Sequence, residues 1–219
     1  MATNMASNAA PRRGDDTRER LLDSVETLIA DHGYQVLTHR QIAQRADVHV
    51  ALLNYHFGSK EQLVEDALAR RVGRLMQLQK EGLERVLATG SWTVEDVLWA
   101  LWQPFAVLDA SSEPNWRNYL CMVARLASYD RGEALFLRHF GEVERATTEA
   151  LSRALPALSQ DEIARGMRYA RLILERELRE RCGGTALRPD EQQRRSEQVV
   201  AFLAGGLRAL HTDVARTTG

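Results

Sequence analysis

Residues 38–60 read THRQIAQRADVHVALLNYHFGSK, and this stretch decides the fold of the N-terminal part of the chain. It predicts two short helices joined by a tight turn at Asp47 and Val48, which is the pattern of a helix-turn-helix. Thr38 is placed to cap the first helix, and Gln41 follows three residues later, as in a capping box. The apolar face of that helix would consist of Ile42, Ala43 and Ala46.

The second helix of the motif is expected over about residues 49–57. Leu53 and Phe57 lie one turn apart, so they would form its buried side. Gly58 is typical of a helix end, and Ser59 with Gln62 suggests a second capping box at the start of the next helix. The motif is therefore expected to have a defined end and to lead directly into a further helix.

This stretch resembles the DNA-binding domain of the TetR family of transcriptional regulators. The residues that match the family pattern are Thr38, Arg40, Ile42, Ala43, Ala46, Val48, Tyr55, His56, Phe57, Ser59, Lys60, Glu61 and Leu63. Two positions depart from it, because Asp47 stands where the family usually has Gly, and Asn54 stands where an aromatic residue is common. Asp adopts left-handed backbone more readily than most residues, so we expect the turn to form.

A recognition helix presents its first residues to base edges in the major groove. Here these would be His49, Val50, Ala51 and Leu52. None is Arg, Lys or Gln, so the usual bidentate readers of guanine and adenine are missing. The small apolar residues can contact thymine methyl groups, and His49 can make one hydrogen bond to a base.

The rest of the predicted DNA-binding set lies around this helix. His39 and Arg40 begin the preceding helix, and Arg40 is the best candidate for a guanine or phosphate contact. The resemblance implies phosphate contacts from Thr38, Asn54, Tyr55, His56 and Lys60. Tyr55 and His56 could instead be core residues of a small bundle. We favour the surface interpretation for these two because Leu53 and Phe57 already define the buried side.

Composition sets weaker limits on the 219-residue chain. Its formal net charge of -1 does not indicate nucleic-acid binding, although local placement of Lys and Arg can create a basic face. Cys121 and Cys182 are far apart, so we expect no disulfide framework and a cytoplasmic location. There is no signal peptide and no apolar run of 18 residues, so no membrane span is expected. Residues 1–14 are expected to be a disordered arm whose Arg12 and Arg13 could touch DNA.

Hydrophobic periodicity predicts an all-α chain of about nine helices and no strand. The expected domains are a three-helix helix-turn-helix unit at residues 15–68 and a ligand-binding and dimerisation domain at residues 69–219. Outside the motif, the expected helices cover about residues 16–32, 59–87, 93–108, 115–129, 132–155, 159–182 and 189–214. The boundary between the domains would fall inside the long helix that starts at Ser59.

Aromatic side chains on four consecutive helices of the second domain are the candidate ligand-binding residues. They are Trp99, Trp102, Phe105, Trp116, Tyr119, Met122, Phe136, Phe140 and Tyr169, the methionine being counted with them. Such residues are either plain core or the lining of a cavity between helices, and the resemblance favours a cavity for a bulky, apolar effector. Arg117, Arg125 or Arg171 could pair with an acid group on that ligand, or could be solvated surface charges.

The last two helices carry apolar stripes, and Gly205 and Gly206 would permit close approach of another helix. We therefore expect a homodimer through a four-helix bundle, since a palindromic operator requires two-fold symmetry. No phosphate loop, nucleophile elbow, metal motif or cofactor motif is present, so no enzyme is expected. The interpretation is a repressor released from double-stranded DNA by a small effector. The alternative is a helical ligand-binding protein without specific DNA binding.

Overall fold

The computed structural model describes residues 13–111, 115–127, 130–181 and 187–210. Over these ranges the chain forms nine α-helices and no strand. The helices are α1 (Arg13–His32), α2 (His39–Arg45), α3 (Val50–Phe57), α4 (Lys60–Ala88), α5 (Val94–Asp109), α6 (Trp116–Ala127), α7 (Asp130–Ala154), α8 (Gln160–Arg181) and α9 (Pro189–Ala209). The predicted all-α architecture is confirmed.

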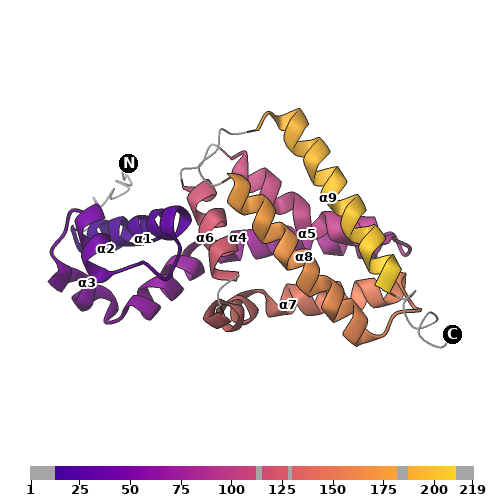
Figure 1. The fold of residues 1–219 in the computed structure, drawn as a ribbon, viewed down its shortest axis with the longest axis horizontal. Helices are drawn as coiled ribbons and strands as arrows, with labels where there is room; N and C mark the ends of the chain where they lie inside the picture. The colour runs from indigo at the N-terminus through magenta and orange to yellow at the C-terminus, as the bar shows by residue number, and fades with distance from the viewer. Residues whose placement is uncertain (1–12, 112–114, 128–129, 182–186, 211–219) are drawn as a thin grey trace, which may run out of the picture.

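The helices divide into two groups along the long axis of the molecule (Figure 1). Helices α1, α2 and α3 lie together at one end, and α5, α7, α8 and α9 form the larger group at the other. Helix α4 starts in the first group and continues into the second, and α6 lies where the two groups meet (Figure 1). One helix therefore belongs physically to both groups.

The two short helices form where the sequence predicts them. Thr38 caps α2, because its hydroxyl accepts the Gln41 N–H while the Gln41 side chain reaches back to the Thr38 N–H. Asp47 has a φ of 52°, which is the left-handed turn expected at this position. Gly58 follows α3 with a φ of 72°, where a side chain would be strained, and Ser59 then caps α4.

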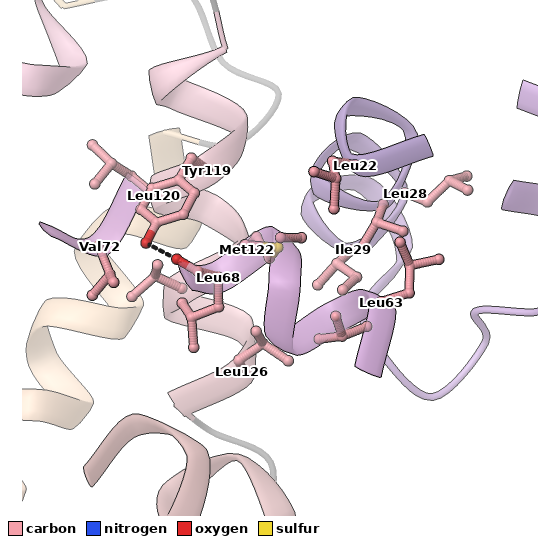
Figure 2. Packing of buried hydrophobic residues seen from close by; sticks show 14 of the residues in the cluster. Leu22, Leu28, Ile29, Leu63, Leu68, Val72, Tyr119, Leu120, Met122 and Leu126 are labelled. Carbon is pink, nitrogen blue, oxygen red and sulfur yellow. Dashed lines mark hydrogen bonds between the residues drawn. The ribbon is translucent and has the colours of Figure 1, made fainter. Parts of the chain in front are cut away.

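A continuous hydrophobic core joins the helix-turn-helix to α6. Its members come from α1, α2, α3 and α4 and continue into α5, α6, α7 and α8. Figure 2 shows the centre of this core, where Leu22 and Ile29 of α1 and Leu63 of α4 lie near Met122 and Leu126 of α6. A second core fills the space among α4, α5, α7, α8 and α9. The proposed boundary near residue 69 therefore does not coincide with a break in packing.

One expected helix start needs correction. The first helix begins at Arg13 rather than at about residue 16, and residues 1–12 of the expected arm lie outside the described residues. On α9 the buried stripe is Val200, Leu203, Ala204 and Leu207, whereas Gly206 is exposed.

The sequence predicted no disulfide framework, whereas Cys121 takes part in a disulfide bond. The chain has one other cysteine, Cys182, which lies outside the described residues.

Packing between the last two helices depends on a position without a side chain. A Cβ atom added at Gly166 of α8 would overlap the end of the Leu207 side chain of α9, so that leucine would have to change its conformation. Within the described ranges, no helix combines the length and the apolar character needed to cross a bilayer.

Candidate functional site

The first turn of α3 points its side chains into solvent. His49 is the residue before the helix, and Val50, Ala51 and Leu52 are exposed, with 40% of Leu52 accessible. Leu53 is fully buried and Phe57 is nearly so, which matches the predicted inner side. The helix is therefore held by one face while its opposite face stays open at the end that a major groove would receive.

Basic residues outnumber acidic residues in the motif although the chain as a whole is close to neutral. Within residues 38–60 the fully charged side chains are Arg40, Arg45 and Lys60, against the single acid Asp47. Arg40 and Arg45 are exposed. His39, partly buried beside Arg40, begins α2, and Thr38 is exposed at the cap. The motif thus has a local positive charge, which non-specific attraction to phosphate requires.

Lys60 stabilises the motif in the free protein. Its Nζ donates to the Leu37 carbonyl at 3.2 Å and lies 4.4 Å from the centre of the Tyr34 ring. The hydroxyl of Tyr34 donates in turn to Glu61 at 3.2 Å. An ammonium group has three N–H donors, so Lys60 can keep the Leu37 bond and still contact a phosphate.

Tyr55 and His56 differ in exposure from the core residues of α3. Tyr55 is 82% exposed, and His56 is partly buried with its ring edge-on to Tyr55 at 5.3 Å. Asn54 is also exposed. These three side chains are accessible to a ligand on the surface of the motif, as are the residues of the first turn.

Arg20 of α1 holds the turn between α2 and α3, a role that sequence reasoning missed. Its Nη2 donates to the carbonyl of Ala46 and, at 2.9 Å, to the carbonyl of Asp47. The turn carbonyls are thereby satisfied by a side chain from another helix. Because Arg20 lies 26 residues before the turn, no local pattern in the sequence could have identified this contact.

The second candidate site is a cavity of about 80 Å³ among α4, α5, α7, α8 and α9. Four of the predicted aromatic residues line it: Trp102, Phe105, Phe136 and Phe140. Phe136 and Phe140 stack on each other with their ring centres 4.4 Å apart. The remaining lining residues are Gln79, Leu98, Leu101, Val143, Glu144, Met167, Ala170, Arg171, Leu174 and Leu203.

The other predicted ligand-binding residues lie elsewhere. Trp99 lines a separate surface hollow between α4 and α5, and Tyr169 is half exposed on α8. Trp116, Tyr119 and Met122 belong to the core shared with the helix-turn-helix, because the inner face of α6 turns toward α1 and α4 (Figure 2). The sequence pattern identified apolar helix faces but not which neighbouring helix each face meets.

Of the polar residues that line the cavity, Arg171 was considered from the sequence and Gln79 was not. Arg171, one of three arginines considered for an acid group, binds both carboxylate oxygens of Glu144, at 2.7 and 2.8 Å. The other two are placed outside the cavity, where Arg117 pairs with Asp109 and Arg125 donates to the carbonyl of Asp31. Gln79 was missed, because nothing in the sequence distinguishes it from the other glutamines of this long amphipathic helix.

A buried charge cluster lies between the two groups of helices. Glu26 of α1 has no exposed surface, and Arg70 and Arg71 of α4 approach its Oε1 to 2.8 and 3.5 Å. Burial raises the pKa of the Glu26 carboxyl from 4.5 to about 7, against the opposing effect of the two arginines. Arg70 also pairs with Asp23 and Glu19, so α4 is joined to α1 by several charges.

Helix α6 completes this junction. The Tyr119 hydroxyl donates to the carbonyl of Leu68 at 2.7 Å, the bond drawn in Figure 2. Asn115 donates to Asp23 and Asn118 to the hydroxyl of Thr27, both at 3.2 Å. Polar contacts therefore connect α6 to both α1 and α4, next to the continuous apolar core.

Comparisons with known proteins agree with this arrangement. The family model described as bacterial regulatory proteins, tetR family, matches residues 21–67, and that described as tetracyclin repressor-like, C-terminal domain, matches residues 99–206. Among curated proteins, the HTH-type transcriptional repressor KstR of Rhodococcus jostii is 39% identical over 71 residues, and KstR of Mycobacterium tuberculosis is 37% identical over 60. These matches span 32% and 27% of each chain in the pair, so the chain spans about a third or less of the length of these relatives.

Solved structures share the fold over most of the chain. AmtR of Mycobacterium smegmatis has a TM-score of 0.55 and 20% identity, covering 93% of this chain and 96% of its own. A TetR family transcription regulator from Marinobacter aquaeolei has a TM-score of 0.53 and 16% identity, covering 88% and 96%. With the N-terminal and C-terminal models of one family matching in order along nine helices, the chain belongs to the TetR family of transcriptional regulators.

Proposed function

We propose that the protein is a homodimeric transcriptional repressor that acts in the cytoplasm. In this proposal α3 of each subunit enters a major groove of a palindromic operator, and a small, largely apolar effector releases the complex. The observation that carries the proposal is the first turn of α3, which is exposed while Leu53 and Phe57 hold the opposite face of the helix in the core.

Readout of the operator would rest on few direct base contacts. Val50, Ala51 and Leu52 offer methyl groups to thymine, and His49 offers one hydrogen bond. Arg40 is the residue that we propose for a guanine or phosphate contact. Most of the affinity would then come from phosphate contacts by Thr38, Tyr55, Lys60 and their neighbours, and it should depend strongly on salt.

Dimerisation is supported by apolar residues that a single chain leaves uncovered. Tyr169 and Leu172 on α8 are more than half exposed, and Phe202 on α9 is 69% exposed. A Cβ added at Gly205 or Gly206 would have no heavy atom within 4 Å, so this side of α9 is open. Two copies could cover these faces as a four-helix bundle, which would place two recognition helices on two half-sites.

Regulation is proposed to act through α4. This helix begins next to the motif and contributes Gln79 to the cavity. The cavity volume of about 80 Å³ is well below the roughly 300–1,000 Å³ of sites for drug-sized ligands. The effector is therefore proposed to be smaller than the bulky molecule expected from the sequence, or to bind as the helices separate.

The sign of regulation follows the named relatives, which are transcriptional repressors. Their similarity to this chain extends over 71 and 60 residues. An effector that binds better to the conformation with the wrong half-site spacing would shift the population away from DNA. Release by ligand is accordingly the proposed default.

Selection of bound fragments from genomic or random DNA tests the proposal. We expect recovery of a palindrome whose affinity falls steeply as salt rises, because several phosphates are contacted. Recovery of no sequence, with only weak salt-sensitive binding, would favour a helical ligand-binding protein instead. The apolar first turn of α3 and the net charge of -1 are the observations that keep this alternative in view.

A further inference from the structure

We propose that the cavity binds a small, uncharged, largely apolar molecule with one hydrogen-bond donor, and that Gln79 Oε1 is the acceptor that recognises this donor. The inference deepens the proposed function and rests on it for the biological role of the ligand as an effector. The chemistry itself is argued from the cavity lining.

The orientation of the Gln79 side chain is set by its own hydrogen bond. Gln79 is 5% exposed on α4, and its Nε2 donates to the carbonyl of Leu101 on α5 at 3.1 Å. An amide carries its donor and acceptor on opposite atoms, so Oε1 is fixed as the free end. Within the described residues this buried oxygen has no hydrogen-bond partner, which is costly for a polar atom in an apolar surrounding.

The two charged residues in the lining, Arg171 and Glu144, form an ion pair with each other. Arg171 and Glu144 form their pair at 2.7 Å with 18% and 22% of their side chains exposed, and the guanidinium lies 5.6 Å from the centre of the Phe136 ring. A carboxylate ligand would have to compete with Glu144 and would also face the lone pairs of Gln79 Oε1. A ligand ammonium would meet an acid already paired with Arg171. The lining therefore favours a ligand without net charge.

The size and remaining surface of the cavity favour an apolar body. The rest of the lining is aliphatic or aromatic apart from the thioether of Met167, and Phe136 and Phe140 present stacked rings. A cavity of about 150 Å³ accepts benzene, so the 80 Å³ here suits one ring after a small outward movement of the walls. A buried water usually makes about three hydrogen bonds, and this lining offers few partners for it.

A matched pair of probes isolates the hydrogen bond. Phenol and toluene have one ring and similar shape, and only phenol can donate to an amide oxygen. The full-length protein should be titrated with each by isothermal calorimetry in the absence of DNA, as wild type, as Gln79→Met and as Gln77→Met. Gln77 is on the same helix, is exposed, and bonds only along the helix to Glu81, so it controls for loss of a glutamine from α4.

We expect wild type and Gln77→Met to bind both probes and to share the same phenol-to-toluene affinity ratio. In Gln79→Met this ratio should fall by at least about tenfold, because phenol loses its acceptor while toluene keeps its contacts. Benzoate should bind wild type at least about tenfold more weakly than phenol. If Gln79→Met does not fold, as judged by circular dichroism, Gln79→Leu should be used in its place.

An affinity ratio that is unchanged by the Gln79 substitution would overturn the inference, as would tighter binding of benzoate or binding of neither probe to wild type. These outcomes can be distinguished from failure of the proposed function. The titrations contain no DNA, and the operator selection contains no ligand. A normal phenol preference without an operator would leave the cavity assignment standing and remove the repressor role.

Discussion

The helix-turn-helix and the effector cavity use buried and exposed positions in opposite ways. On α3, the residues proposed for DNA are exposed and the residues that hold the fold are buried, often as immediate neighbours. In the cavity, residues such as Trp102, Phe105 and Phe140 are both lining and core. The difference teaches that binding and stability can be separated by mutation in the first region, but are bound together in the second.

Leu52 and Leu53 give the largest expected effect and the most direct test of this separation. Leu53 is fully buried, so Leu53→Ala should lower the free energy of unfolding by about 2–5 kcal/mol. Leu52→Ala should change it by less than about 0.5 kcal/mol, because that side chain is exposed, yet it should weaken operator binding. Urea unfolding monitored by circular dichroism measures the free energy of unfolding of both variants. Equal destabilisation by the two variants would show that the exposed face is also structural.

Glu26 tests the junction between the two regions. Between pH 4.5 and about 7 the folded state keeps a proton that the unfolded chain has lost, so this group makes the free energy of unfolding fall as pH rises. The free energy of unfolding of Glu26→Gln, relative to that of wild type, should therefore rise by about 2 kcal/mol between about pH 5 and about pH 7.5.

Glu84→Gln is the control for this experiment, since Glu84 is exposed on α4 and should show no such gain. Urea unfolding at each pH gives the comparison. A variant that instead loses stability relative to wild type as pH rises would mean that attraction to Arg70 and Arg71 outweighs burial, and that the carboxyl is ionised at neutral pH.

Arg40 should show an effect on binding without an effect on folding. Its exposed side chain should contribute little to stability, whereas Arg40→Ala should weaken operator binding by about 1–3 kcal/mol if it reads a base. Fluorescence anisotropy with the selected operator at fixed salt measures this loss. A similar loss on unrelated DNA would assign Arg40 to phosphate, and unchanged affinity on both would remove it from the interface.

Tyr119 should give the smallest effect. Tyr119→Phe removes the hydroxyl that donates to Leu68, which should cost about 1 kcal/mol of stability. Tyr55→Phe makes the same change on an exposed side chain and should have no measurable effect on stability. Thermal unfolding of both variants gives the comparison, and equal midpoints would mean that water replaces the bond inside the junction.

Local chemistry explains what could be predicted from the sequence. The capping box at Thr38, the cap at Ser59, the left-handed turn at Asp47 and the helix end at Gly58 all involve residues within a few positions of one another. Each of these features is determined by residues within a short segment, so the bounds of the two helices of the motif were predicted to within about one residue. The period of apolar residues similarly predicted the number of helices.

Contacts between distant segments explain what could not be predicted. Tyr119 looked like a cavity residue, but its neighbours are decided by the way α6 packs on α1 and α4. The role of Arg20 at the turn depends on a helix pair, and that of Gln79 depends on a carbonyl of α5. Each of these requires the arrangement of helices in space, which periodicity along one helix does not contain.

Helix α4 also relates the displacement at the cavity to the displacement at the helix-turn-helix in the proposed regulation. If the Tyr119–Leu68 contact acts as a fulcrum, the arm to Gln79 is about 16 Å and the arm to Lys60 is about 12 Å, at 1.5 Å per residue. The lever therefore reduces displacement rather than amplifying it. An effector that moves the cavity end of α4 by about 1 Å would move the recognition end by about 0.7 Å in each subunit. Under this geometry the size of the effector determines how far α4 moves. Ligands that fit without displacing α4 would not change DNA binding.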